Sequence, residues 1–125
     1  MDPNPMESLL REAPEIARAF DDLLEAIRRG DWTDAKTKHL LNIAIQTAQR
    51  NPRGVFFHAS MARDAGARRE EVVGAVVMNL HLSGLIPVLD CLPAAVQGYD
   101  AEGAGNTRDG GGRWKERRAE GTVGV

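Results

Sequence analysis

The residues of this chain best suited to chemistry lie in one short segment, residues 51–58. If a helix begins there, Asn51, Gly54 and His58 share one face, because they stand at i, i+3 and i+7. A helix start offers unpaired N–H groups and the positive end of the helix dipole, so residues 51–54 are a candidate seat for an anion. Arg53 adds a guanidinium suited to a carboxylate. His58 is then a candidate acid or base towards a bound molecule that carries a carboxylate.

A second interpretation of His58 needs no ligand. On a helix it shares a face with Val55, Ala59 and Ala62, where a buried histidine would hydrogen-bond to the backbone. The sequence leaves both interpretations open.

The chain has three histidines, His39, His58 and His81, and we expect each in a different helix. Three imidazoles that meet could hold Zn²⁺ or another divalent ion. No two of them share a helical turn, which is the spacing typical of metal motifs, so the sequence predicts no metal site and no other cofactor.

His39 and His81 each have a less specific alternative. His39 shares a polar stripe with Asn42 and Gln46, where it would face solvent or a neighbouring subunit rather than a site. His81 lies beside Met78 and Leu85 and is a candidate for the lining of an apolar substrate pocket.

The elements that must position these residues follow the helical period. Apolar residues recur at i, i+3, i+4 and i+7, Asn51-Pro52 is a favoured helix start, and Pro93 must kink or restart the last helix. No segment alternates with a period of two, so the fold class is all-α, a bundle of five to six helices. We expect helices over residues 5–11, 14–29, 34–50, 52–65, 69–83 and 87–99.

Composition divides the chain near residue 100. Residues 1–100 suit one helical domain, whereas residues 101–125 hold seven of the thirteen glycines and are expected to form a flexible tail. The net charge of −2 is spread over both signs, which disfavours a nucleic-acid partner. There is no apolar run of membrane-spanning length and no signal-peptide pattern at the N-terminus, so we expect a cytoplasmic protein without a membrane partner.

Two of the expected helices, residues 34–50 and 69–83, are apolar nearly all round. One small domain has little interior in which to bury them, so the pattern favours a homo-oligomer over burial within a monomeric bundle. The single cysteine, Cys91, excludes an intrachain disulfide and stands beside Leu89 and Leu92, where it is expected to be a small buried hydrophobe.

From about residue 13 to residue 100 the sequence resembles the carboxymuconolactone decarboxylase and AhpD-like alkylhydroperoxidase superfamily. The likeness rests on the order and spacing of several segments: Ala-Pro-Glu-Ile at 13–16, Asp-Ala-Lys-Thr-Lys-His-Leu-Leu at 34–41, His-Ala-Ser-Met-Ala-Arg-Asp-Ala-Gly-Ala at 58–67, Arg-Glu-Glu-Val at 69–72, and Ser83-Gly84 with Pro87. The resemblance implies an AhpD-like helical bundle and a trimer or hexamer.

The resemblance also separates two activities. The peroxidase branch has a Cys-x-x-Cys where this chain has Asn51 and Gly54, and a glutamate of its proton relay where this chain has His39. Dithiol peroxidase activity is therefore disfavoured. The decarboxylase branch lacks the cysteines and keeps a histidine at the position of His58, although its arginine two residues earlier is Phe56 here.

The resemblance thus favours a cofactor-independent lyase acting on a small carboxylated substrate of the lactone type, with His58 as general acid/base. The alternative is a non-catalytic helical oligomer, or a member that binds a small ligand or a metal. A peroxidase that uses Cys91 is the weakest hypothesis.

Overall fold

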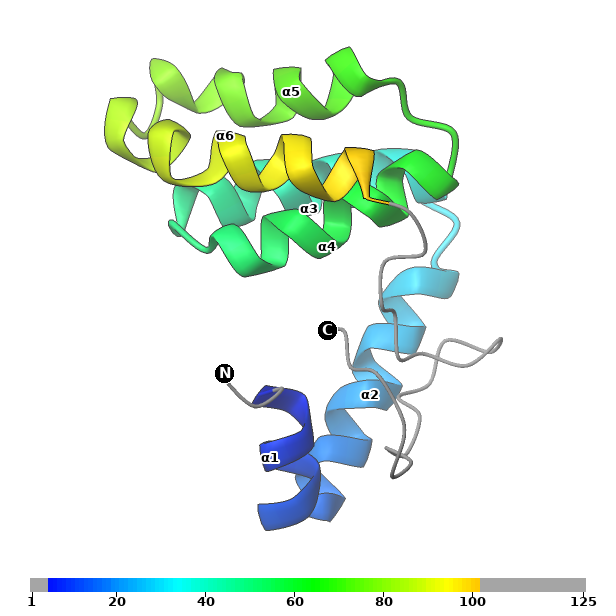
Figure 1. Ribbon diagram of the computed structural model, residues 1–125. Helices are drawn as coiled ribbons and strands as arrows, with labels where there is room; N and C mark the ends of the chain where they lie inside the picture. Colours follow the sequence, from blue (N-terminus) through cyan, green and yellow to red (C-terminus); the bar gives the residue numbers. More distant parts are fainter. Residues whose placement is uncertain (1–4, 102–125) are drawn as a thin grey trace. The chain divides into compact units, whose positions relative to one another are not determined.

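A computed structural model describes residues 5–101, and every regular element in that range is helical, which confirms the all-α class (Figure 1). The expected tail, apart from Ala101, lies outside the described residues. The described chain falls into two units, residues 5–31 and residues 32–101. The first holds α1 (Pro5–Glu12) and α2 (Pro14–Arg29); the second holds α3 (Ala35–Ala48), α4 (Pro52–Asp64), α5 (Arg69–Val77), the short 3-10 helix η1 (Met78–Leu80) and α6 (Leu85–Asp100).

In the first unit, α2 begins at Pro14, whose missing N–H costs nothing in a first helical turn, and ends at Gly30. Ala17 and Asp21 are buried on this helix. The helical period places further apolar residues on the same helix, and four of the large ones are exposed to solvent: Ile16, Phe20, Leu23 and Ile27.

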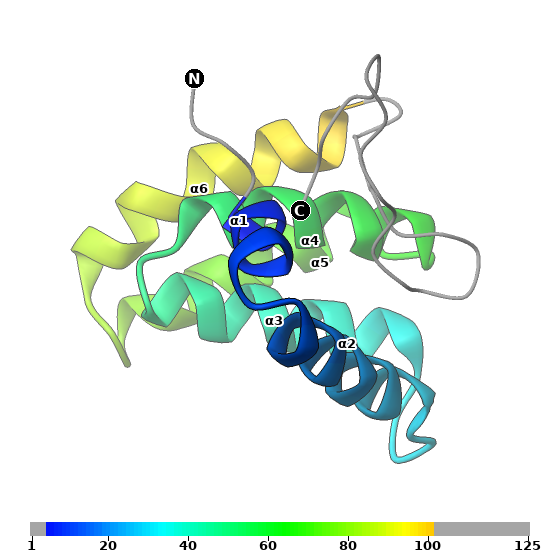
Figure 2. The same ribbon diagram turned by 90° about the horizontal axis from the view of Figure 1, so that it is seen from below.

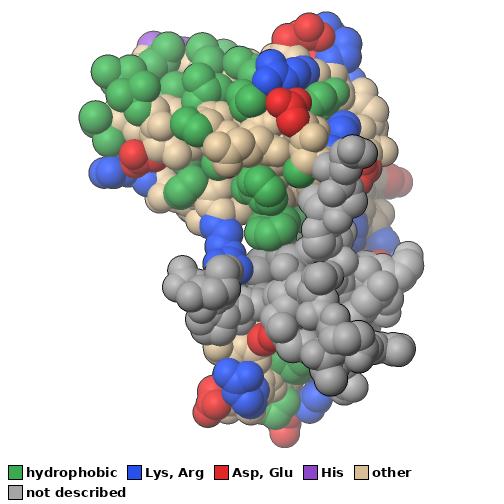
Figure 3. Space-filling model, viewed as in Figure 1, with side chains coloured by type: hydrophobic (Ala, Val, Ile, Leu, Met, Phe, Trp, Pro, Cys, Tyr) green, Lys and Arg blue, Asp and Glu red, His purple; other side chains and the backbone are tan. Residues whose placement is uncertain are grey.

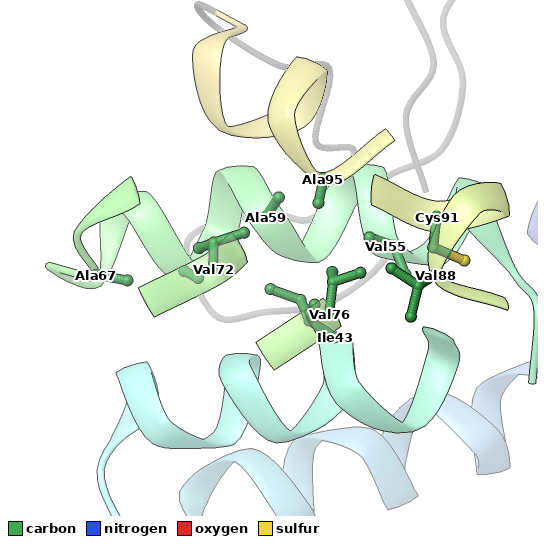
Figure 4. Packing of buried hydrophobic residues seen from close by; sticks show 10 residues of the cluster. Ile43, Val55, Ala59, Ala67, Val72, Val76, Val88, Cys91 and Ala95 are labelled. Carbon is green, nitrogen blue, oxygen red and sulfur yellow. The ribbon is translucent and has the colours of Figure 1, made fainter. Parts of the chain in front are cut away.

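The second unit is built around one apolar core, drawn in Figure 4. Its members come from α3 to α6 and from the segment that leads into α5. They are small or β-branched, so the helices approach closely: Ile43, Val55, Ala59, Ala62, Ala67, Val72, Val76, Val88, Cys91 and Ala95. Gly98 shows how closely, because a Cβ there would collide with the carbonyl oxygen of Phe56 on α4. The ribbon seen from below shows the same helices along their length (Figure 2).

The predicted helix over residues 69–83 is too long, since α5 ends at Val77 and a 3-10 turn follows. Asn79 explains the early end. Its buried side-chain amide donates to the carbonyl of Ala44 at 3.1 Å and to that of Val76 at 3.4 Å, and its backbone carbonyl oxygen accepts from the N–H of Ser83 at 2.7 Å. An asparagine side chain that binds the backbone in this way competes with helix continuation.

The last helix begins two residues before the start predicted at residue 87. It begins at Leu85, directly after Gly84, whose φ of 98° is readily adopted only by glycine. It continues through Pro93 to Asp100 as one element, so of the two effects predicted for Pro93, a kink or a restart, the restart does not occur. Among the described residues, no helix combines the length and apolar character needed to cross a membrane.

Candidate functional site

The candidate site lies between α3 and α4, which pack side by side and are joined by a tight turn. Asp34 caps the start of α3 by accepting the N–H of Thr37 at 2.7 Å. The turn to α4 puts Arg50 in the left-handed region at φ 56°, and the N–H of Asn51 then donates to the carbonyl of Gln46 at 2.9 Å. Asn51 caps α4, its side chain accepting the N–H of Gly54 at 3.3 Å, and Pro52 follows as predicted.

A chain of side-chain amides, here called the amide chain (Asn42, Gln46 and Asn51), connects the two helices. Asn51 Nδ2 donates to Gln46 Oε1 at 2.7 Å. Gln46 Nε2 in turn donates to Asn42 Oδ1 at 3.2 Å. The polar stripe predicted on α3 is therefore turned towards the start of α4, and the bond from Asn51 to Gln46 links the two helices at their turn.

Gly54 is the position that makes room for this amide chain. A Cβ added there would collide with the carboxamide of Gln46 and would come within 2.9 Å of Asn51 Nδ2. The Gln46 side chain thus fills the space beside the start of α4. A side chain at position 54 would have to displace Gln46, so glycine suits this position because it has no side chain rather than because of an unusual φ.

Two of the three histidines meet further along the same pair of helices. His39 Nδ1 on α3 lies 3.1 Å from His58 Nδ1 on α4, and both side chains are partly buried. Their ring centroids are 5.3 Å apart and the ring planes are tilted by 41°. We call these two residues the histidine pair.

A contact between two Nδ1 atoms restricts the protonation of the histidine pair. One nitrogen must carry the hydrogen and donate, while the other must present its lone pair and accept. The pair can therefore hold one proton between the rings, and placing a hydrogen on both facing nitrogens would set two donors against each other. Such a unit can take up or release a proton at a fixed place, which is what general acid/base chemistry requires.

Arg53 stands in the first turn of α4 and is partly buried. Its Nε is buried and has no hydrogen-bond partner among the described residues. Pro52 has no N–H and the Gly54 N–H already donates to Asn51, so donors for an anion in this turn come from Arg53. Of the residues 51–54 predicted to bind an anion, Arg53 is therefore the one whose side chain offers an unused donor.

His81 lies elsewhere in the fold. It follows η1, outside any α-helix, and its side chain is exposed. Within residues 5–101, no group of three or more His, Cys, Asp or Glu side chains is close enough to hold a metal ion. The predicted placement of His81 within a long fourth helix is therefore wrong.

Cys91 has the environment of a structural thiol. It is fully buried at 0% exposure, and burial raises the pKa of its thiol, although Thr47 and the backbone of Asn51 lie close by. A raised pKa keeps sulfur in the unreactive thiol form. The expectation of a small buried hydrophobe is confirmed.

One further signal in the sequence bears on the amide chain. The polar stripe on α3, with Asn42 and Gln46, does not by itself predict the pairing with Asn51. Polar residues at 39, 42 and 46 before a tight helix turn, and at 51 and 58 after it, indicate such a pairing.

Comparison with known proteins agrees with the all-helical fold. The model of the carboxymuconolactone decarboxylase family matches residues 14–97. A crystal structure of the apo form of a carboxymuconolactone decarboxylase family protein from Legionella pneumophila is similar, with 26% sequence identity and a TM-score of 0.66. The similarity covers 76% of this chain and 84% of that one. No curated protein gives a significant match.

Proposed function

This chain belongs to the carboxymuconolactone decarboxylase family, and on that premise we propose that it is a cofactor-independent lyase acting on a small carboxylated substrate of the lactone type. The observation that carries the proposal is the 3.1 Å contact between His39 Nδ1 and His58 Nδ1. The two histidines in this contact can hold a proton at a defined position, in a site that lacks the thiols of the peroxidase chemistry.

The proposed step is the loss of CO₂ from the bound substrate. When the bond to the carboxylate carbon breaks, its electron pair remains on the substrate as an enolate, which must then be protonated at carbon. His58 gives that proton, and His39 holds the His58 ring and returns a proton that is taken from water. His39 is thus a positioning residue, while His58 touches the reacting atoms.

Arg53 would hold the substrate. A buried guanidinium nitrogen without a partner costs free energy, and a carboxylate oxygen is its natural acceptor. The positive end of the α4 dipole adds to the attraction. Asn51 and Gly54 contribute by shaping this turn. The Asn51 cap, together with the absence of a side chain at Gly54, determines the backbone position from which the Arg53 side chain extends.

The test is the release of CO₂ from γ-carboxymuconolactone by the wild type, by His58→Gln and by His81→Gln. We expect His58→Gln to reduce turnover by about 10²–10⁴-fold, the usual contribution of a positioned acid or base. His81→Gln is the matched control, because it removes an exposed imidazole outside the pair. A wild type that releases no CO₂, or a His58→Gln variant that keeps full turnover, contradicts the proposal.

A homo-oligomer, trimer or hexamer, is proposed in either case, and an assembly without catalysis is the second candidate function. The observation in its favour is the amount of exposed apolar surface in the second unit. Exposed side chains come from α3, from the region around η1 and from the start of α6: Leu41, Ile45, Val77, Met78, Leu80, Leu82, Leu85, Ile86 and Leu89. Apolar side chains gather on the face of the second unit seen in Figure 3. Apolar surface of this extent marks an interaction site.

A further inference from the structure

The two nitrogens of the histidine pair lie at the separation expected for two ligands of one metal ion. Nitrogens bound to Zn²⁺ at about 2.0–2.1 Å lie about 2.9 Å apart when they subtend a right angle and about 3.4 Å apart at the tetrahedral angle. The distance from His39 Nδ1 to His58 Nδ1 is 3.1 Å, between these limits. From the geometry we infer that the histidine pair binds one divalent ion of the kind that prefers imidazole, such as Zn²⁺, Ni²⁺ or Cu²⁺.

The ligands are held in place before any ion arrives. Each imidazole stands on a helix rather than a loop, and the 2.7 Å bond from Asn51 to Gln46 links those helices at their turn. The fully buried Ile43 and Val55 pack into the core close by on α3 and α4. Ligands mounted on rigid elements lose little freedom when they bind an ion.

The number of ligands that the protein supplies determines whether the metal site is open or closed. With no third His, Cys, Asp or Glu close enough within residues 5–101, the protein gives two nitrogens and water completes the shell. Such a site is open and exchangeable, unlike the closed four-ligand sites that hold structural zinc.

Binding the ion requires one change of tautomer. In the hydrogen-bonded pair one ring carries its hydrogen on Nδ1, whereas both Nδ1 lone pairs must face the metal. That ring loses its Nδ1 proton and gains one on Nε2, with water as the carrier, so the neutral pair keeps its proton count. A proton and a metal ion therefore compete for the same gap. The inference does not rest on the proposed lyase function, because the affinity is measured without substrate.

The test is titration of the full 125-residue chain, free of any histidine tag, with Zn²⁺ by calorimetry. We expect one ion per chain. Outer-shell partners of a metal alone change affinity by about 10–100-fold, so His39→Gln and His58→Gln should each weaken binding at least about tenfold, while His81→Gln should leave it unchanged. Absence of binding to the wild type, equal affinity in the pair variants, or loss in His81→Gln overturns the inference.

A second measurement decides the matter even if a pair variant fails to fold. Nitrogen NMR of the ¹⁵N-histidine-labelled wild type should show Zn²⁺ shifting the Nδ1 signals of His39 and His58, with both Nε2 atoms protonated and His81 unmoved. Shifts confined to His81 or to Nε2 atoms would assign the ion elsewhere and refute the site. Neither experiment involves CO₂ release, so failure of the lyase proposal and failure of the metal proposal are distinguishable.

Discussion

At the scale of single residues, this site differs from a Cys-x-x-Cys site at Gly54 and in the position of the Gln46 side chain. The second motif position holds no side chain at all, and the carboxamide of a residue from the preceding helix occupies the space. That carboxamide bonds to the helix cap at 2.7 Å and to Asn42 at 3.2 Å. The start of α4 is thus held by amides, which have no redox chemistry.

The first prediction concerns Gly54→Ala. In a helix, alanine is better than glycine by up to about 1 kcal/mol, but here the new Cβ must expel Gln46 and break its two amide bonds. We therefore expect the substitution to stabilise the protein only in the Gln46→Ala background. Chemical unfolding of the double-mutant cycle should give a coupling of about 1–2 kcal/mol.

Gly74→Ala on α5 is the matched control, because a Cβ there meets nothing within 4 Å. It should raise stability by a similar amount whether or not Gln46 is present. Additive effects of Gly54→Ala and Gln46→Ala would show that the two positions do not compete for space.

At the scale of single residues, the sequence predicted local roles better than it predicted contacts between helices. Asn51 as a cap, Pro52 as the first helical residue and Cys91 as a buried thiol follow from local rules. The contact of His39 with His58 does not, because the residues are 19 positions apart on different helices. It depends on the register between α3 and α4, which is set by their packing in the shared core.

At the scale of elements, helix starts were predicted more accurately than helix ends. The starts of α2, α4 and α5 are encoded in adjacent residues: Pro14, Asn51-Pro52, and Glu71 accepting the Arg68 N–H at 2.8 Å. The end of α5 is encoded at a distance, since Asn79 donates to Ala44 on α3. A local pattern contains no information about that acceptor.

Two carboxylates at helix starts make the free energy of unfolding depend on pH. Hydrogen bonds with Thr37 lower the pKa of Asp34 below its ordinary 3.8, and the Arg68 N–H lowers the pKa of Glu71 below 4.5. A lowered folded-state pKa means stabilisation that is complete above the ordinary pKa and lost as pH falls through the lowered one. We expect the free energy of unfolding to fall as pH drops below about 4.5.

The comparison for this prediction is the double variant Asp34→Asn, Glu71→Gln. Asparagine still caps a helix but does not titrate, so the variant keeps the helix starts and loses part of the acid dependence. Urea unfolding between pH 7 and pH 2 measures both proteins. Parallel curves of unfolding free energy against pH would contradict the assignment.

At the scale of the whole molecule, the described chain is two units that both present apolar side chains to solvent. Ile16, Phe20, Leu23 and Ile27 line α2. On the second unit, Ile45 is 57% exposed and Leu82 is 72% exposed. The sequence predicted helices with more apolar surface than one small domain can bury, and the exposed residues account for that excess. The number and arrangement of chains in the proposed homo-oligomer depend on surfaces that no helical period encodes.

The prediction at this scale is that light scattering finds the wild type at a multiple of the mass of one chain. Ile45→Lys places a charge in the exposed apolar region of α3 and should shift the protein towards a single chain, with helix content unchanged. Gln97→Lys adds the same charge at an exposed polar position of α6 and should leave the assembly intact. A single-chain wild type, or equal effects of both lysines, would argue against the proposed homo-oligomer.

The proposed chemistry depends above all on one shared proton between His39 and His58. Nitrogen NMR of ¹⁵N-histidine-labelled protein, without metal, measures it directly through the coupling that a hydrogen bond transmits between two nitrogens. The geometry predicts a single Nδ1 proton whose signal is coupled to both Nδ1 atoms, with His81 as an independent ring. Two uncoupled rings, each protonated at Nε2, would contradict the histidine pair and the acid/base chemistry built on it.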